Sequence, residues 1–199
     1  MAKNLEERVK ELEKEVAQLK GKATIKISKK LGIGDTFELV GLRWKILDIT
    51  DKGYMCLAEK LNEEMQFDSD CNNWQASNLR IFLNTEFIDK LAFEIGVENV
   101  IEFDRDLLSM DGQIEYGTCE DKVSLLTVDE YRKYRALIPN TGDYWWWLVT
   151  PDSTACNDDT SWVRVVSPFG LVNDIICYRI CGVHPLCIFS SAIFESEEE

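Results

Sequence analysis

Three cysteines and the single histidine of the chain lie close together near its C-terminal end: Cys177, Cys181, His184 and Cys187. Thiolate and imidazole are ligands that zinc prefers. Their spacing matches no zinc knuckle, however, and the alternation of side chains along a strand would keep Cys177 and Cys181 from converging. A nucleophilic pair of Cys and His is not specified either, because any of the 7 cysteines could partner His184. We therefore expect neither a metal nor a cofactor here.

An acidic pattern, Asp68-x-Asp70-x-Asn72, matches the opening of a calcium-binding EF-hand loop. Such a loop needs Gly at its sixth position and Glu at its last position, where this chain has Asn73 and Leu79. The pattern therefore does not predict a calcium site. Sequence motifs for a nucleophile elbow, a zinc protease or a phosphate-binding loop are also absent, so we expect no catalytic residues and no enzyme.

Residues 152–187, called the window below, have an unusual composition. They contain no Lys, Glu, Gln or Met, although the chain as a whole is rich in Lys and Glu. Strands are depleted in Lys and Glu, which explains part of the deficit. Residues 173–181 also alternate with no clear apolar face. A segment without a hydrophobic period is not optimised as a protein core.

The sequence before the window predicts strands followed by helices. Residues 25–51 indicate two short strands, and residues 54–58 indicate a third. Apolar residues at steps of three and four predict one helix, or two short ones, over residues 72–95, with a break near Asn84 and Thr85.

A capping box of Thr127 and Glu130 predicts a short helix that runs to Arg135. The run Trp145-Trp146-Trp147 is expected to bury alternate rings on the two faces of a strand. Later strands are expected at residues 144–149, 162–166, 171–177 and 183–189. The fold class is therefore α+β, with the helices early and an antiparallel sheet late.

Residues 1–21 predict a coiled coil that forms a homo-oligomer through residues 5–19. The apolar seam has the heptad spacing, with charges beside it that attract in a parallel pair; it consists of Leu5, Val9, Leu12, Val16 and Leu19. Dimer and trimer both remain open at this length. An amphipathic helix packed on its own domain is the alternative interpretation.

The 199 residues suffice for one domain, residues 22–194, beside this helix, with residues 195–199 as a solvated acidic tail. The net charge of -14 argues against nucleic acid or an anionic membrane as a partner. The sequence has no apolar run long enough for a transmembrane helix and no signal peptide at its start. We therefore expect a protein that is cytoplasmic as synthesised, with reduced cysteines.

Several short motifs, taken together, resemble a known family. They are Trp74-x-x-Ser77-x-Leu79-Arg80-x-x-Leu83-Asn84-x-x-Phe87, Leu125-Leu126-x-x-x-Glu130-x-x-x-Tyr134, Trp147-Leu148-x-x-Pro151 and Gly182-Val183-x-Pro185. Their order and spacing resemble the C-type-lectin-like domains that serve as variable proteins of diversity-generating retroelements. The match covers roughly residues 34–189.

The resemblance implies a binding protein whose C-terminal segment is rewritten by adenine-directed mutagenesis of a template RNA. AAC or AAT codons then become NNC or NNT, which cannot encode Lys, Glu, Gln, Met or Trp. The deficit in the window is the one that such a mechanism implies. Trp162, the one window residue outside the permitted set, would be fixed.

The resemblance also implies roles for individual residues. The diversified, ligand-binding side chains would be Asn157, Asp158, Asp159, Arg164, Phe169, Asn173, Asp174, Ile176, Tyr178, Arg179, Ile180 and His184. The framework would be Trp147, Trp162, Gly170, Gly182 and Pro185. Family members commonly have Arg where His184 stands, so His184 is either altered framework or itself variable.

The leading interpretation is a non-enzymatic receptor or display protein that binds a macromolecular ligand, expected to be a protein, and is presented on a phage particle or a cell surface. Four cysteines, at 156, 177, 181 and 187, would be by-products of randomised codons. One alternative is an oxidoreductase of the related formylglycine-generating-enzyme-like fold, which needs a reactive pair such as Cys177 and Cys181 with lowered thiol pKa values. Another alternative is a structural component of a phage particle.

Overall fold

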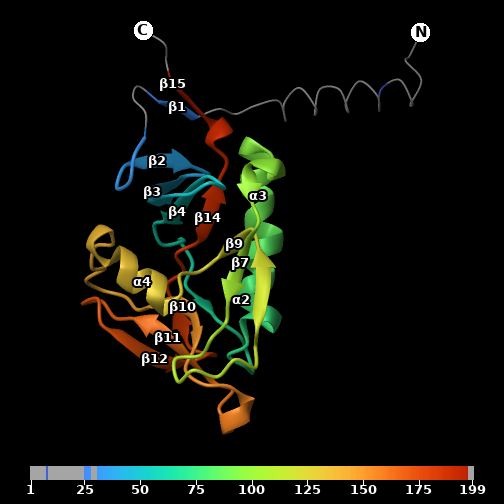
Figure 1. Cartoon of the computed structure of the whole chain (residues 1–199), viewed down its shortest axis with the longest axis vertical. Helices are drawn as coiled ribbons and strands as arrows, with labels where there is room; N and C mark the ends of the chain where they lie inside the picture. The colour runs from blue at the N-terminus through green and yellow to red at the C-terminus, as the bar shows by residue number, and fades with distance from the viewer. Residues whose placement is uncertain (1–7, 9–24, 28–30, 197–199) are drawn as a thin grey trace.

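The computed structural model describes Arg8 and residues 25–27 and 31–196 (Figure 1). The seam on which the coiled-coil prediction depends lies outside the described residues.

Antiparallel strands make up most of the described fold. The largest sheet has six strands, in the order β2-β3-β4-β14-β6 with β9 also paired to β14, and a second sheet has the order β10-β11-β12. The strands are β1 (Ile25–Ile27), β2 (Thr36–Leu39), β3 (Leu42–Ile49), β4 (Tyr54–Ala58), β5 (Met65–Gln66), β6 (Val100–Ile101), β7 (Phe103–Asp106), β8 (Thr118–Asp121), β9 (Val123–Ser124), β10 (Trp146–Pro151), β11 (Trp162–Val166), β12 (Val172–Ile176), β13 (Ile180–Cys181), β14 (Leu186–Phe189) and β15 (Phe194–Ser196).

The helices lie where the apolar periodicity and the caps predict them. They are α2 (Asn78–Phe82), α3 (Ile88–Ile95) and α4 (Val128–Tyr134), with the short turns η1 (Trp74–Ala76), η3 (Val97–Asn99), η4 (Arg135–Leu137), η5 (Ala155–Asn157) and η6 (Ser191–Ile193). The expected break near Asn84 is a π-helical turn, η2 (Leu83–Phe87). The capping box of Thr127 and Glu130 is formed as predicted.

The class is mixed α+β, but the expected separation of early helices from a late sheet is wrong. The late strand β14 lies in the same sheet as β2, β3 and β4, with Leu186 opposite Leu57 and Phe189 opposite Tyr54. Residues 25–51 hold three strands rather than two. Which strands pair is decided by long-range register, and local composition does not encode register.

The first two residues of the expected acidic tail, Glu195 and Ser196, lie in strand β15. This strand pairs in parallel with β1, so that Lys26 lies opposite Glu195 and Ile27 opposite Ser196. Main-chain pairing does not depend on apolar side chains, so an acidic composition does not prevent it.

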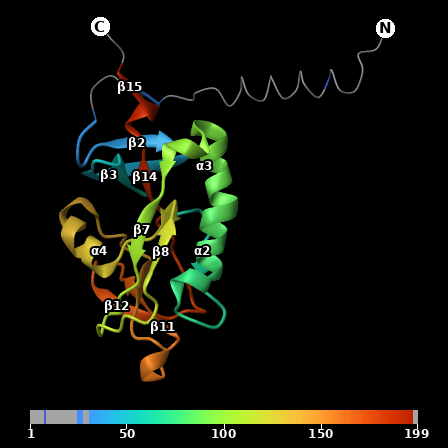
Figure 2. The same cartoon turned by 45° about the vertical axis from the view of Figure 1, so that its right-hand side comes forward.

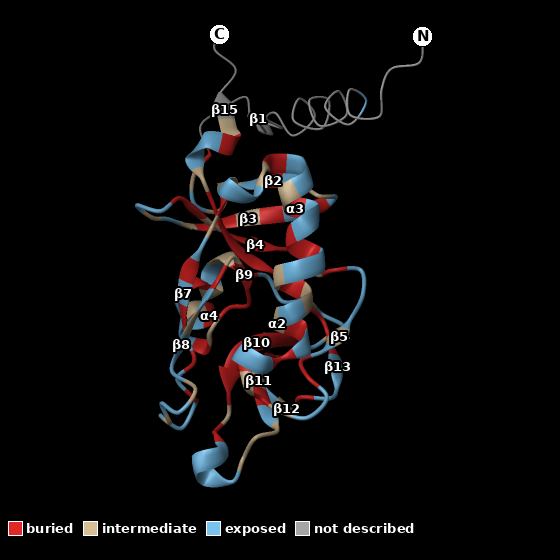
Figure 3. Ribbon diagram, turned by 90° about the vertical axis from the view of Figure 1, so that its right-hand side faces the viewer, coloured by how far each residue is buried: buried red, intermediate tan, exposed pale blue. Residues whose placement is uncertain are grey.

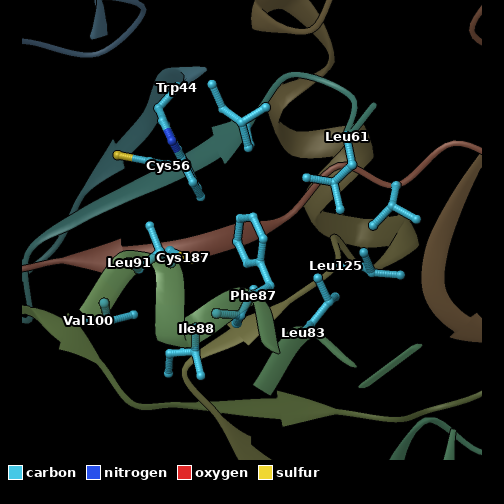
Figure 4. Packing of buried hydrophobic residues seen from close by; sticks show 14 of the residues in the cluster. Trp44, Cys56, Leu61, Leu83, Phe87, Ile88, Leu91, Val100, Leu125 and Cys187 are labelled. Carbon is cyan, nitrogen blue, oxygen red and sulfur yellow. The ribbon is translucent and has the colours of Figure 1, made fainter. Parts of the chain in front are cut away.

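Each face of the main sheet is buried, and β14 shows this most clearly. Leu186 and Ile188 pack in a cluster with Tyr131 of α4, whereas Cys187 and Phe189 pack in a cluster with residues of α2 and α3. Figure 4 shows the second cluster, in which Cys187 of β14 faces the helices that carry Phe87 and Leu91. A strand covered on both faces has no polar side, so its hydrophobic pattern is continuous.

The two sheets lie toward opposite ends of the long axis of the molecule, with α4 along one side and α2 and α3 along the other (Figures 1 and 2). Strands β1 and β15 lie at one end. Strands β11 and β12 and the turn η5, all within the window, lie at the other end. Figure 3 shows that β10 and most of β11 are buried, whereas η5 is exposed.

Candidate functional site

One part of the window forms a strip on the outer face of β11 and β12. The register places Trp162 opposite Ile176 and Arg164 opposite Asp174, and directly opposed residues share a face. The Arg164 guanidinium forms ion pairs with Asp152 and with Asp174, the latter at 3.6 Å. The same face continues into Val166 and Val172, which pack in one cluster with residues of α4. The strip is therefore the other half of this face, which carries Trp162, Arg164, Asp174 and Ile176.

A second part of the window lines a hollow of about 510 Å³ beyond β12. Tyr178 and Ile180 are half or more exposed there, and Arg179 lies between them on the same wall. Trp145 and Ile175 contribute the apolar floor. Of the Trp run, Trp146 and Trp147 are buried in different clusters, as expected, and Trp145 is the partly exposed member.

The loop between β10 and β11 carries Asn157, Asp158 and Asp159. Asn157 donates to the Asp111 carboxylate at 2.8 Å, and Asp159 accepts the main-chain N–H of Ser161 at 3.0 Å. Asp158 adopts the left-handed conformation, with φ of 56°, which Asp tolerates better than most residues. The tip of this loop is exposed, while its base is tied to the loop between β7 and β8.

Asp111 is the anchor of that contact. Its carboxylate accepts hydrogen bonds from Ser109 (2.5 Å), Ser153 (2.7 Å) and Asn157. The bond from Ser109, followed by that from Ser153, lowers the pKa of Asp111 to about 2, so this carboxylate is ionised at neutral pH. The window loop is thus held by an acceptor outside the window.

Two of the expected ligand-binding residues stand apart from the rest. Phe169 is 74% exposed on the turn between β11 and β12, on the side of α4. Asn173 belongs to the opposite row of β12 from Asp174 and lies beside the buried Val165, so it is half buried. The structure therefore gathers Arg164, Asp174 and Ile176 on one strip and leaves Phe169 and Asn173 outside it.

His184 is not part of the strip and instead lines a separate cavity. One ring nitrogen, Nδ1, is 2.9 Å from the carbonyl oxygen of Ala58, and Nε2 is 2.9 Å from the hydroxyl of Tyr144. Burial lowers the pKa of His184 to about 4, so the ring is neutral at pH 7. A side chain bonded at both nitrogens has the surroundings of a framework residue.

The other framework residues are packed, with one exception. Trp147 donates its indole N–H to Met65 at 2.8 Å, and a side chain at Gly182 would collide with the Tyr144 ring at 2.8 Å. Tyr131 donates its hydroxyl to the carbonyl of Gly170 at 2.9 Å. Trp162 is the exception, because 42% of it is exposed on the outer strip.

The four window cysteines differ in burial. Cys177, Cys181 and Cys187 are buried in the core, and Cys156 is the exposed one of the four. The three buried thiols pack as small apolar side chains. Burial raises the pKa of Cys177 to about 11 and that of Cys181 to about 12, the reverse of what a reactive pair requires.

Residues outside the window hold its main chain in place, and sequence reasoning missed them. The pattern Asp68-x-Asp70-x-Asn72, rejected as a calcium loop, has this role. The Asp68 carboxylate accepts three main-chain N–H groups of its own loop, including those of Asp70 (2.8 Å) and Asn78 (2.9 Å). The Asn72 amide then donates to the carbonyls of Ser153 and Trp162, both at 3.0 Å. The signal available in the sequence was the tendency of Asp and Asn to bind nearby main chain in turns.

Further contacts of the same kind run along the window. We call the residues that make them the scaffold. Their bonds join Phe67 N–H and Asp68 N–H to Cys177 O (3.0 and 3.2 Å), Asn72 N–H to Thr160 O (2.6 Å), Leu61 N–H to Val183 O (2.9 Å), Ala58 N–H to Pro185 O (2.8 Å) and the Gln66 amide to Tyr178 O (2.7 Å). All of them end on main-chain atoms of the window.

Within the described ranges, no three side chains of His, Cys, Asp or Glu gather as they would around a metal ion. None of the helices in the described part of the chain combines the length and apolar composition needed to cross a bilayer. Comparison with protein-family models, with curated proteins and with solved structures gives no match to this chain.

Proposed function

We propose that this chain is a non-enzymatic binding protein in which the window presents changeable side chains on a fixed scaffold. Within the α+β class, we assign the chain to the C-type-lectin-like fold. The proposed origin of the variation, mutagenesis by a retroelement, rests on the family resemblance. Its ligand is a macromolecule, which we take to be a protein. The coiled coil expected at residues 5–19 would multiply weak contacts by avidity.

The observation that carries the proposal is that the scaffold binds the main chain of the window rather than its side chains. Asn72, Gln66 and the strand edges bond carbonyls that are present whatever side chain follows. Replacing Tyr178 or Ile180 would therefore leave these bonds unchanged. A surface whose main chain is held independently can vary in sequence without loss of fold, as in antibody loops.

The exposed side chains suit recognition of a protein surface. Trp162 on β11, Tyr178 just after β12 and Ile180 on β13 supply exposed apolar area. Strands β11 and β12 lie at the end of the molecule opposite β1 and β15 (Figure 1). Aromatic residues contribute most of the binding energy in many interfaces. Trp162 cannot arise from the randomised codons, so it would be a constant aromatic contact beside changeable ones.

The binding function can be tested with two matched libraries. One, the window library, randomises Phe169, Asp174, Tyr178, Arg179 and Ile180. The other, called the scaffold library, randomises five residues outside the window, namely Gln66, Asp68 and Asn72 of the scaffold together with Ser77 and Tyr131, whose hydroxyls bond main-chain carbonyls. Each library is displayed on yeast, sorted for protease resistance and then selected for binding to hen lysozyme. We expect most members of the window library to remain folded and to yield binders, whereas most members of the scaffold library unfold. Equal loss of folding in the two libraries would contradict the proposal.

The origin of the variation has a separate test in the DNA beside the gene. We expect a near-copy of the codons for residues 152–187 that differs almost only at adenines, next to a gene for a reverse transcriptase. A locus with neither feature would remove the retroelement from the proposal and leave the binding function to the library experiment.

A further inference from the structure

A second cavity lies over the corner of the main sheet, away from the strip on β11 and β12. It has a volume of about 480 Å³, within the range of small-molecule sites. Its floor is a row of directly opposed residues on β2, β3 and β4, namely Thr36, Lys45 and Leu57. Residues 137–141 and Tyr144 line it too, as do Trp146 and His184, which we call the end wall.

Most of the wall is apolar. Leu57, Ile138 and Trp146 belong to one buried cluster, and Leu137 packs against it. An apolar body placed between these side chains moves its own surface out of water, which is favourable by roughly 25 cal/mol for each Å² buried. The cavity therefore favours a ligand with a hydrophobic portion.

Lys45 gives the cavity its charge. Its ammonium donates to the carbonyl of Leu137 at 3.0 Å, and no carboxylate of the described residues forms an ion pair with it. By contrast, Lys60 pairs with Glu64 and Lys133 pairs with Asp48. An ammonium has three donors, so Lys45 retains two for a ligand.

The rim adds little net charge. Arg43 pairs with Glu38 at 3.3 Å, and the Glu59 carboxylate accepts the main-chain N–H of Arg43 at 3.2 Å. The charged residues that line the cavity, Arg43, Lys45 and Glu59, therefore sum to one positive charge, which matches a ligand with one negative charge. Lys45 is the cation among them that has no carboxylate partner in the described part of the chain. Because charge-assisted hydrogen bonds are stronger than neutral ones, this group would fix the orientation of the ligand.

The end wall is neutral. The Nδ1 of His184 faces a carbonyl, which can only accept, so Nδ1 carries the proton and Nε2 accepts the Tyr144 hydroxyl proton. The Tyr144 oxygen keeps an acceptor position of its own. His184 therefore closes the cavity without adding a second cation.

We propose that this cavity is a binding site for a small organic monoanion, a carboxylate or a phosphate diester, with an apolar body, and that Lys45 binds its charged group. Among the lining residues His184 is the one that belongs to the window. The site would consequently bind the same small ligand in variants whose exposed window residues differ. This binding does not depend on the macromolecular ligand proposed above.

The test uses the full chain and the fluorescent aromatic sulfonate 1-anilinonaphthalene-8-sulfonate, displaced by small competitors. We expect saturable binding at one site that benzoate and methyl phenyl phosphate displace, with benzyl alcohol and inorganic phosphate at least about tenfold weaker. The ratio of the affinities for benzoate and methyl phenyl phosphate then identifies the preferred anionic group. Lys45→Met should weaken binding roughly tenfold to a hundredfold, the effect of one charge-assisted hydrogen bond.

The matched control is Lys52→Met, which removes one exposed charge at the turn between β3 and β4 and should leave affinity unchanged. Thr36→Trp fills the exposed edge of the cavity without changing charge and should also abolish binding, so the proposal does not depend on Lys45→Met folding normally. Affinity that is equal in wild type, Lys45→Met and Thr36→Trp would overturn the proposal. So would displacement by inorganic phosphate or by benzyl alcohol as effective as displacement by benzoate.

Discussion

Two stretches of the chain that contact each other use their side chains in opposite ways. In residues 67–80 the side chains of Asp68, Asn72 and Trp74 are buried and bonded, and they determine where the main chain runs. In the window, the main-chain carbonyls accept hydrogen bonds from scaffold residues, and side chains such as Tyr178 and Ile180 are exposed. The first stretch specifies structure, and the second is supported by it.

The difference has a physical cause. A buried polar side chain that loses its partner leaves a donor or acceptor unsatisfied, which costs about 1–3 kcal/mol, whereas an exposed side chain is replaced by water at little cost. The buried side chains of residues 67–80 are therefore sensitive to substitution, and the exposed side chains of the window are not. Each prediction below tests one side of this comparison.

The largest expected effect comes from two tryptophans in the two stretches. Trp74 is fully buried and donates to the Asp121 carboxylate at 2.6 Å. Trp74→Ala should lower the free energy of unfolding by about 3–5 kcal/mol, because it leaves a cavity and removes a partner of Asp121. The measurement is urea denaturation followed by circular dichroism.

Trp162→Ala is the matched control for this variant. Because Trp162 is 42% exposed, its removal should lower the free energy of unfolding by about 1 kcal/mol. A loss as large as that of Trp74→Ala would mean that Trp162 is framework in the sense that the family resemblance implies, and the outer strip would not be a free surface.

The sequence predicted the parts of the fold that depend on local signals. The helix interrupted at Asn84, the capping box at Thr127 and the strand at residues 54–58 are all confirmed, because periodicity and caps act over a few residues. The pairing of β4 with β14 joins segments far apart in the chain and has no local signal. The short strands β5 to β9 and β13 were missed for the same reason.

The candidate site was predicted less completely than the fold. The composition of residues 152–187 marks out one segment of the chain, but composition does not say which side of a strand a residue occupies. Asn173 and Asp174 are adjacent in sequence and lie on opposite rows of β12. The sequence could not decide whether His184 is variable or framework, because the residues that bond it, Ala58 and Tyr144, are distant in the chain.

His184 provides a second prediction, because it belongs to the window in sequence but both of its ring nitrogens contact residues outside the window. Its pKa is about 4 in the folded chain against 6.5 in the unfolded chain, so the unfolded chain takes up a proton first as the pH falls. The stabilisation is complete above about pH 6.5 and is lost as the pH falls toward 4. Between pH 7 and pH 4.5 we expect a loss of about 2 kcal/mol from this group.

The measurement is the free energy of unfolding of wild type and His184→Gln at these two pH values. Gln does not titrate, so the difference between the proteins should shrink by about 2 kcal/mol at the lower pH, while the acidic residues contribute equally to both. A difference that stays constant with pH would show that His184 is solvated like an ordinary exposed residue, and would return it to the variable set.

The smallest expected effect is the most direct test of the window itself. Phe169, Tyr178 and Ile180 are all half or more exposed, and no scaffold hydrogen bond ends on their side chains. Replacing all three by Ser should change the free energy of unfolding by no more than about 1 kcal/mol, because exposed substitutions are near neutral and add independently. Phe67→Ser, at a fully buried position beside Trp74, is the matched control and should unfold or severely destabilise the chain. If the triple variant were destabilised as much as this control, the fold would depend on these three side chains. Positions on which folding depends cannot be diversified freely, so the proposed binding function would be contradicted.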